Sequence, residues 1–361
     1  MDLRFCQQSR TGPEGATSSP FETSSVFRSF RQIPDSSQET TIGTLGELSD
    51  ILLNPVGELL AGPSKKVRSG LLLASAGLCS RGRLDPKIIK QCHDLAEVLE
   101  NLHAGSLIID DIQDQAVVRR GRPTLHEQLG VPLAINAGNW LYFKALKLIE
   151  KAQLSPDLEL RLYRLCNDTL FEGHLGQALD VGIRIDEIEQ SRVPTVCYAA
   201  MTMKSGALIS LAAEVGARVT RAPEDLVEAF ATFGKSFGCV LQMFNDLNEF
   251  VRSSSGLNKD LFLRRPSWIW AVASECLAPA DYASLTKSLG TIAQNEDMGA
   301  INEFLRAKNL VQEARVRAQE KMRDCIDFLF SSLAQHGINP VDHPNWQALL
   351  RLKSMVESSN E

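Results

Sequence analysis

Apolar residues recur three and four positions apart along most of this 361-residue chain, from about residue 45 onward. That spacing places them on one face of an α-helix, whereas strands would need a strict alternation that is absent. Several helix starts carry proline after a capping residue, as in Asp85-Pro86 and Ser155-Pro156. We therefore predict an all-α fold. The expected helices are 45–60, 65–80, 86–116, 132–152, 156–184, 194–218, 223–252, 266–277, 280–290, 297–334 (with a break near 308) and 344–357.

The first 43 residues differ from the rest of the chain. Residues 1–43 are rich in Ser, Thr, Gln, Gly and Pro and lack periodicity, so we expect a disordered leader. Its five acidic residues against four arginines argue against an organelle transit peptide, which would be poor in acids. Residues 44–361 show no repeat and no internal boundary, so we expect one α-helical domain there.

Composition narrows the classes of function. The net charge is −6 and no basic block stands out, which argues against nucleic-acid binding. No apolar run reaches the roughly 18 residues that span a bilayer, so we expect no stable membrane insertion. Eight cysteines are scattered without a Cys-x-x-Cys pair, which is typical of reduced thiols in a cytoplasmic protein.

A cluster of carboxylates lies at the end of the third expected helix. Asp110, Asp111 and Asp114 fall within five residues, and helical spacing predicts that they project on one side. Clustered carboxylates repel one another unless a cation neutralises them, and oxygen ligands suit Mg²⁺. Arg119 and Arg120 follow, and guanidinium groups match phosphate geometry. The pattern indicates a magnesium–diphosphate site. For the carboxylates alone, a solvated polar stripe is the alternative.

Two further polar groups fit the same interpretation. His103 lies on the same helical stripe as Asp110, about 10 Å away along the axis, although a single histidine on a helix is usually structural. On another expected helix, Gln242 and Glu249 share a face with either Asn245 or Asp246. Two oxygen-rich clusters on different helices are what a metal site between facing helices requires.

These motifs resemble the trans-isoprenyl diphosphate synthase family, whose helical fold is shared with class I terpene cyclases. The resemblance covers roughly residues 57–270, and its Asp-Asp-x-x-Asp segment followed by Arg-Arg-Gly-x-Pro is specific. It implies a single-domain helical bundle around a central apolar cavity, two or three Mg²⁺ ions, an isoprenyl diphosphate substrate and a homodimer.

The resemblance also implies roles for individual residues. Serine stands at Ser64 and Ser69, where the family carries glycine and proline around its Lys-Arg-x-Arg segment. The implied metal ligands are Asp110, Asp111, Asp114, Asn245, Asp246 and Glu249. The implied substrate contacts are Lys65, Arg68, His103, Arg119, Arg120, Lys204, Gln242 and Lys259. The implied catalytic residues are Asp110, Asp111, Asp114, Arg119 and Lys204.

One departure from the elongating enzymes decides the predicted activity. The second motif begins with Asn245 and ends with Glu249, as in class I cyclases, although the cyclase serine is missing. The serines that replace glycine and proline around Lys65 favour the same activity. We therefore predict a Mg²⁺-dependent terpene synthase that ionises an allylic diphosphate, with farnesyl diphosphate favoured, and cyclises the carbocation. The alternative is a chain-elongating prenyl diphosphate synthase, supported by Lys65, Arg68, His103 and Arg120. A non-catalytic synthase subunit is a third hypothesis.

Small and aromatic residues supply expectations about the apolar cavity. Gly105 and Ser106 precede the first motif, and their small size predicts a deep pocket. A carbocation needs aromatic faces around it, although aromatic residues at this spacing are more often simple core. The candidates are Trp140, Tyr142, Phe143, Phe171 and Phe244.

Overall fold

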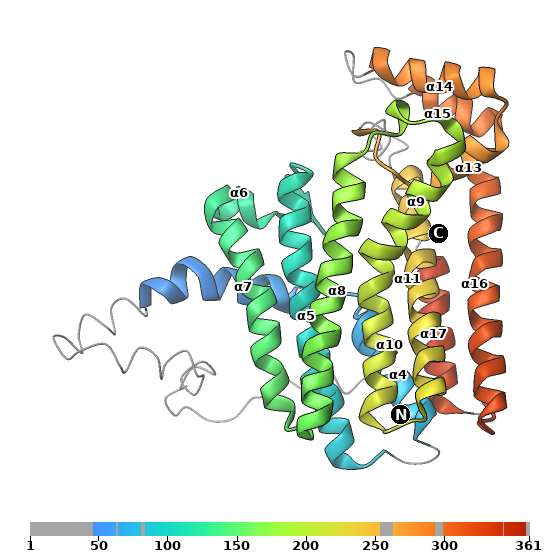
Figure 1. The fold of residues 1–361 in the computed structure, drawn as a ribbon. Coiled ribbons are helices and arrows are strands. Elements are labelled where there is room, and N and C mark those ends of the chain that lie inside the picture. Colours follow the sequence, from blue (N-terminus) through green and yellow to red (C-terminus); the bar gives the residue numbers. More distant parts are fainter. Residues whose placement is uncertain are drawn as a thin grey trace.

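The computed structural model describes residues 46–62, 64–80, 84–252, 263–292, 299–341 and 343–358. The expected leader therefore lies outside the described residues. Most of the long helices run side by side, and α14 and α15 lie across one end of the bundle (Figure 1). The all-α prediction is confirmed.

The helices begin and end close to the predicted positions. The N-terminal half contains η2 (Ser49–Leu53), α3 (Asn54–Ala61), α4 (Val67–Cys79), α5 (Pro86–Gln113), α6 (Leu125–Leu129), α7 (Val131–Ile149), η3 (Glu150–Ala152) and α8 (Pro156–Gly182). The central part contains η4 (Ile185–Glu187), η5 (Gln190–Arg192), α9 (Val193–Met201), η6 (Thr202–Gly206), α10 (Ala207–Val219) and α11 (Glu224–Arg252). The remainder contains α13 (Trp268–Cys276), α14 (Pro279–Ile292), α15 (Gly299–Ala307), α16 (Leu310–Gln335) and α17 (Pro344–Ser358).

Helix α5 shows why the local sequence produces these boundaries. Asp85 has extended backbone and its carboxylate accepts a hydrogen bond from the Lys87 amide over 2.7 Å, which satisfies one of the unpaired N–H groups at the helix start. Pro86 follows at the first helical position, where its missing N–H costs nothing. By contrast, the hydroxyl of Ser155 does not cap α8, although Pro156 occupies the equivalent place.

Three differences from the predicted helices bear on the site. A short antiparallel pair, β1 (Val118–Arg119) with β2 (Arg122–Pro123), follows α5 where only a break is expected. The expected helix 194–218 is interrupted by the π-helical turn η6. The helix expected from residue 266 begins at residue 268 instead. The residues before 268 are therefore not helical, and their side chains can reach the site.

Apolar burial joins the helices into one bundle. The largest core cluster includes Phe230, Phe237 and Trp268, on α11 and α13. A second cluster lies between α4, α5, α8 and α10, and a third packs α3 against α5 and α7. Burial of this apolar surface supplies most of the driving force for folding.

The stretch Gln190–Val219 is long and apolar enough to cross a membrane by length and composition, since it contains an 18-residue window with a mean hydropathy of 1.3. The prediction that no such run exists therefore needs correction. However, 61% of its most apolar window is buried inside the bundle, as in the core helix of a soluble protein. Because α9 and α10 also contribute residues to the core clusters, their apolarity is explained by packing.

Candidate active site

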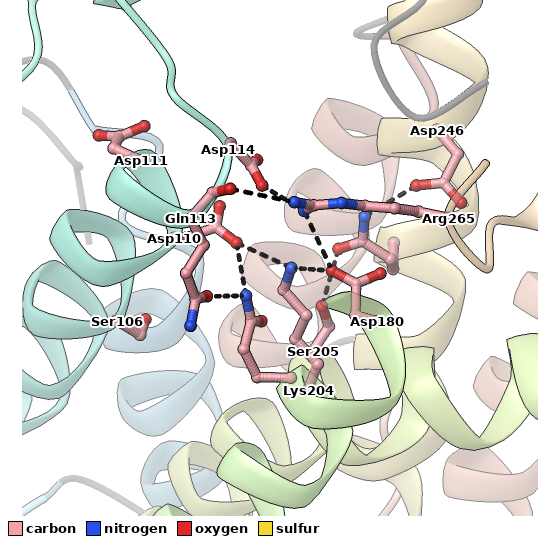
Figure 2. Close-up of polar contacts among 12 residues, drawn as sticks. Ser106, Asp110, Asp111, Gln113, Asp114, Asp180, Lys204, Ser205, Asp246 and Arg265 are labelled. Atoms are coloured by element: carbon pink, nitrogen blue, oxygen red, sulfur yellow. Dashed lines mark hydrogen bonds and ion pairs between the residues drawn. The ribbon is translucent and has the colours of Figure 1, made fainter. Parts of the chain in front are cut away.

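The site is built around Asp110 near the end of α5. Asp110 Oδ1 accepts hydrogen bonds from Lys204 Nζ over 2.9 Å and from Gln177 Nε2 over 3.1 Å. Gln177 also donates to Gln113 Oε1 over 2.7 Å, so α8 is tied to α5 at two points (Figure 2). Burial alone would raise the pKa of Asp110, but the charges of Lys204 and Arg119 and the Gln177 amide together hold it below its usual value.

Lys204 reaches the site because the helix is locally wider at η6. Its ammonium lies between two carboxylates, 2.7 Å from Asp180 Oδ2 as well as 2.9 Å from Asp110 Oδ1. Burial lowers the pKa of Lys204, yet these two partners outweigh that effect and raise it overall. Gly176 permits the close approach of α8, since a Cβ there would lie 2.4 Å from the Lys204 amide nitrogen. Single π-turns of this kind are frequent at functional sites.

Arg265 closes the other side of the carboxylate group. Its Nη1 pairs with Asp114 Oδ1 and lies 3.8 Å from Asp180 Oδ2, and its side chain is only 9% exposed. Figure 2 shows Asp110 and Asp114 directed toward Lys204 and Arg265. Two carboxylates of the first motif therefore meet cations from distant segments of the chain.

Asp111 points to a different side, contrary to the expectation that all three carboxylates project together. Its Oδ1 accepts from Arg119 Nε over 2.7 Å, and it stands apart from Asp110 and Asp114 in Figure 2. Burial raises the pKa of Asp111 despite the opposing charge of Arg119. Arg119 Nη2 also lies 3.2 Å from Asp110 Oδ2, so this predicted diphosphate contact is paired with the carboxylates here.

The predicted second motif lies on α11, and hydrogen bonds tie it to η6 and to the start of α13. Ser205 Oγ donates to Gln242 Oε1 over 2.7 Å, and Gln242 Nε2 donates to Asp246 Oδ1 over 2.8 Å. The other oxygen of Asp246 accepts from the Trp268 amide over 2.7 Å. Asn245 is exposed. Two predicted residues, the side chain of Glu249 and the whole of Lys259, lie outside the described part.

A second group of cations surrounds the predicted His103. Burial lowers the pKa of Arg68 to about 10, with Glu100 opposing and Arg120 adding to the shift, and Arg68 Nε is buried without a hydrogen-bond partner among the described residues. Glu100 accepts from Ser69 Oγ over 2.6 Å. Burial, Arg68 and both arginines after α5 hold the pKa of His103 well below its usual value. An orphaned buried donor among clustered cations is suited to an anion.

The remaining predicted contact in this region lies at the surface. Lys65 is exposed in the segment before α4. Its neighbour Lys66 adopts a left-handed backbone conformation, with φ of 46°. The structure therefore brings Arg68, His103 and Arg120 together and leaves Lys65 at the edge of that group.

The donor set of the first motif fits Mg²⁺. Among the described residues no group of three or more His, Cys, Asp or Glu side chains is arranged to hold a metal ion, because the carboxylates are turned onto Arg119, Lys204 and Arg265. These carboxylates are nevertheless oxygen ligands one helical turn apart, which suits a hard cation. In this structure Arg119, Lys204 and Arg265 supply the positive charge that the clustered carboxylates require.

Several expectations about the apolar cavity are wrong. Phe143 and Phe171 are 69% and 68% exposed, so they do not line an enclosed space, and Phe244 is part of the buried core. Gly105 offers no pocket, since a Cβ there would lie 2.8 Å from the Gly138 carbonyl and 3.0 Å from the Tyr142 ring. Small residues at such points allow two helices to approach closely.

Of the remaining candidates, Tyr142 lies close enough to Asp110 for the two groups to interact electrostatically. Burial and the charge of Asp110 raise its pKa to about 12, and its ring meets His174 edge-on at 5.6 Å. Ser106 is exposed, and its hydroxyl donates back to the His103 carbonyl over 2.8 Å. Trp140 packs against the third core cluster, with Lys144 Nζ 5.2 Å above its ring.

With this geometry established, comparisons with known proteins identify the family. The family model described as polyprenyl synthetase matches residues 49–307. The chain belongs to the polyprenyl synthetase family. It is 29% identical over 208 residues to a geranylgeranyl diphosphate synthase of Sulfolobus acidocaldarius, covering 56% of this chain and 60% of that relative. It is 24% identical over 301 residues to a chloroplastic solanesyl diphosphate synthase of Arabidopsis thaliana, covering 80% and 69%.

Solved structures share the fold. A geranylgeranyl pyrophosphate synthase from Corynebacterium glutamicum, solved with isoprenyl diphosphate and magnesium, aligns with a TM-score of 0.68 at 22% identity over 90% of this chain and 94% of that one. The superfamily resemblance is thereby confirmed. The predicted terpene cyclase activity is wrong, because the family and these relatives are prenyl diphosphate synthases. Asn245 in the first position of the second motif was too little on which to base a cyclase.

Sequence reasoning missed three side chains that the structure brings to the site. Gln177 and Asp180 lie one turn apart on α8, and that spacing of polar residues was the available signal. Arg265 directly precedes the helix expected from residue 266, and the structure places it in the segment before α13. Nothing local in the sequence indicates that these residues face α5.

Proposed function

We propose that this protein is a Mg²⁺-dependent trans-prenyl diphosphate synthase that joins isopentenyl diphosphate to an allylic diphosphate. The observation that carries the proposal is the presence of two separate cationic groups. One, formed by Lys204 and Arg265, lies against the acidic cluster. The other contains Arg68 and Arg120 around His103. An enzyme that joins two diphosphates needs a site for each, whereas a cyclase binds a single diphosphate.

The allylic diphosphate is proposed to bind beside Asp110 and Asp114. When bound there, Mg²⁺ supplies positive charge to the diphosphate oxygens as the carbon–oxygen bond breaks. Lys204 and Arg265 would release their carboxylates to the metal and donate to the leaving group. Because the Lys204 and Arg265 side chains are only 28% and 9% exposed, their charges are weakly screened by water.

The second substrate, isopentenyl diphosphate, is proposed to bind between Arg68 and Arg120. The buried Nε of Arg68 would donate to a phosphate oxygen. His103, kept neutral by its surroundings, can donate one ring N–H without adding charge. The two substrates would thus be held at different levels of α5, with the allylic carbon facing the double bond of its partner.

Incubation of the purified protein with Mg²⁺ and farnesyl diphosphate, with and without isotope-labelled isopentenyl diphosphate, tests the proposal. We expect labelled, longer prenyl diphosphates only when both substrates are present, and loss of activity with EDTA that added Mg²⁺ restores. Arg68→Gln should raise the KM for isopentenyl diphosphate more than that for the allylic substrate, and Arg306→Gln on α15 is the matched control. Consumption of farnesyl diphosphate alone would refute the proposal.

We also propose a homodimer formed through α7 and α8. Ile135 and Phe143 on α7 and Phe171 and Leu175 on α8 are 42%, 69%, 68% and 45% exposed. These two helices pack against each other, and extended exposed apolar surfaces usually mark interfaces. A cytoplasmic location is proposed as well, supported by the seven cysteines of the described part, all of which are free thiols.

A further inference from the structure

We infer that an ion pair outside the site, between Asp186 and Arg264, positions Arg265 for diphosphate binding. Within the described part of the chain, neither side chain forms a hydrogen bond or ion pair with a carboxylate of the first motif or with Lys204. The inference rests on the proposed function for the identity of the ligand, a diphosphate. It concerns residues 263–267, which connect to α13.

Arg264 is fixed through both its side chain and its backbone. Its Nη1 donates to Asp186 Oδ2 over 2.5 Å, and each side chain is 15% exposed. Its carbonyl accepts from the Ile185 amide over 3.0 Å. Both contacts are made to η4, the short turn that follows α8. A partly buried, hydrogen-bonded ion pair is screened less than a surface pair and is geometrically restrictive.

The backbone of Arg264 adopts a conformation that it would otherwise avoid. Its φ is +57°, in the left-handed region that favours glycine. A non-glycine residue persists there when surrounding contacts enforce it. In this structure the contacts to Asp186 and Ile185 hold the backbone of Arg264 in that conformation. This turn determines where the next side chain, that of Arg265, is directed.

The next residues connect three helices of the site. Arg265 pairs with Asp114 on α5 and lies 3.8 Å from Asp180 on α8. The Trp268 amide donates to Asp246 on α11 over 2.7 Å. Displacement of Arg264 would therefore move a cation away from Asp114 and disturb the residue that supports the second motif. Asp186 is a positioning residue, because it acts through Arg264 and not on the substrate.

The test measures binding and not turnover alone. The melting temperature of the full chain is recorded against inorganic diphosphate concentration at fixed Mg²⁺ for wild type, Asp186→Asn and Arg264→Gly. We expect both variants to need about tenfold more diphosphate for half-maximal stabilisation, because a small misplacement of a charged contact is costly. Asp281→Asn on α14 is the matched control, since this aspartate is 44% exposed and pairs with Lys308 over 2.8 Å.

Arg264→Gly keeps the test decisive if Asp186→Asn fails to fold, because glycine adopts the left-handed turn without the cost that arginine bears. The exchanged pair Asp186→Arg with Arg264→Asp should recover affinity toward the wild-type value, since aspartate tolerates that backbone conformation. In steady-state kinetics, both single variants should raise the KM for the allylic diphosphate and leave that for isopentenyl diphosphate unchanged.

Two results would overturn the inference. One is a lower melting temperature with an unchanged diphosphate midpoint, which would assign the pair a structural role only. The other is a wild-type protein that diphosphate and Mg²⁺ do not stabilise. A wild-type protein that binds diphosphate but transfers no prenyl group would refute the proposed function and leave the positioning role intact.

Discussion

Lys204 Nζ donates to Asp110 Oδ1 over 2.9 Å, although the two residues are 94 positions apart in the chain. The same ammonium lies 2.7 Å from Asp180 Oδ2. A single cation thus joins the first acidic motif on α5 to the carboxylate of α8. This contact is possible because η6 widens the helix and Gly176 lets α8 approach.

Replacement of Lys204 by alanine removes that cation and leaves two carboxylates facing each other. We expect Lys204→Ala to lower kcat/KM for the allylic diphosphate by about a hundredfold, as for loss of one preorganised charge at a reacting group. Lys235→Ala is the control, because Lys235 is a partly exposed lysine that pairs with Glu172. Equal activity of the two variants would exclude Lys204 from the site.

Asp110→Ala tests the first motif directly. We expect turnover to fall by about a hundredfold or more while the helical circular-dichroism signal stays close to that of wild type. Asp110 lies at the last turn of α5, where its side chain serves the site more than the core. An active Asp110→Ala protein would remove the metal assignment.

The lowered pKa of His103 predicts how the stability of the folded protein changes with pH. Its pKa in the folded protein is well below the usual 6.5, because burial and neighbouring arginines disfavour the imidazolium. Below pH 6.5 the unfolded chain binds a proton that the folded chain does not, so stability falls as the pH falls toward the folded pKa. The slope for one such group is about 1.4 kcal/mol per pH unit.

Urea unfolding between pH 7.5 and 5.5 measures this slope. His103→Gln should show a flatter pH dependence than wild type. The comparison between the two proteins is needed because burial also lowers the pKa of His343, which contributes in the same direction. Parallel curves for wild type and His103→Gln would contradict the prediction.

A larger side chain at Gly105 tests whether this position is a close contact between two helices or part of an open pocket. Gly105→Val should destabilise the fold by about 1–3 kcal/mol, because its side chain would press on the Gly138 carbonyl and the Tyr142 ring. Ser106→Ala, at the adjacent exposed position, is expected to change the unfolding free energy little. Denaturant titration of both variants measures this difference, and a stable Gly105→Val protein with shorter products would restore the pocket interpretation.

The exposed aromatic pair on α7 and α8 tests the proposed dimer. Phe143→Asp combined with Phe171→Asp should convert a dimer to a monomer, because two buried carboxylates at an apolar interface would be unpaired. Light scattering after size exclusion measures the mass. Phe328→Asp on α16, at a side chain that is 42% exposed, is the control and should leave the dimer intact. A wild-type monomer would refute the assembly.

Local patterns along the chain were sufficient to predict the helices and the chemical groups carried on single helices. Three- and four-residue apolar spacing and the Asp85-Pro86 start are local signals, so α5 and its carboxylates could be predicted before the structure. The acidic motif and the arginines after it lie within a few turns of one another. The family resemblance rested on these short segments.

Which faces of distant helices contact one another depends on how the whole bundle packs. Asp180 and Arg265 reach the acidic group because α8 and the segment before α13 pack beside α5, which no local pattern records. Gly105 was mistaken for part of a pocket because a small residue is equally compatible with an open cavity and with a close helix contact. A phenylalanine such as Phe143 can lie in a cavity wall or on the surface, and its position among the neighbouring helices determines which. Side-chain contacts between distant segments arise from the packing of the whole bundle, and spacing along one helix does not encode them.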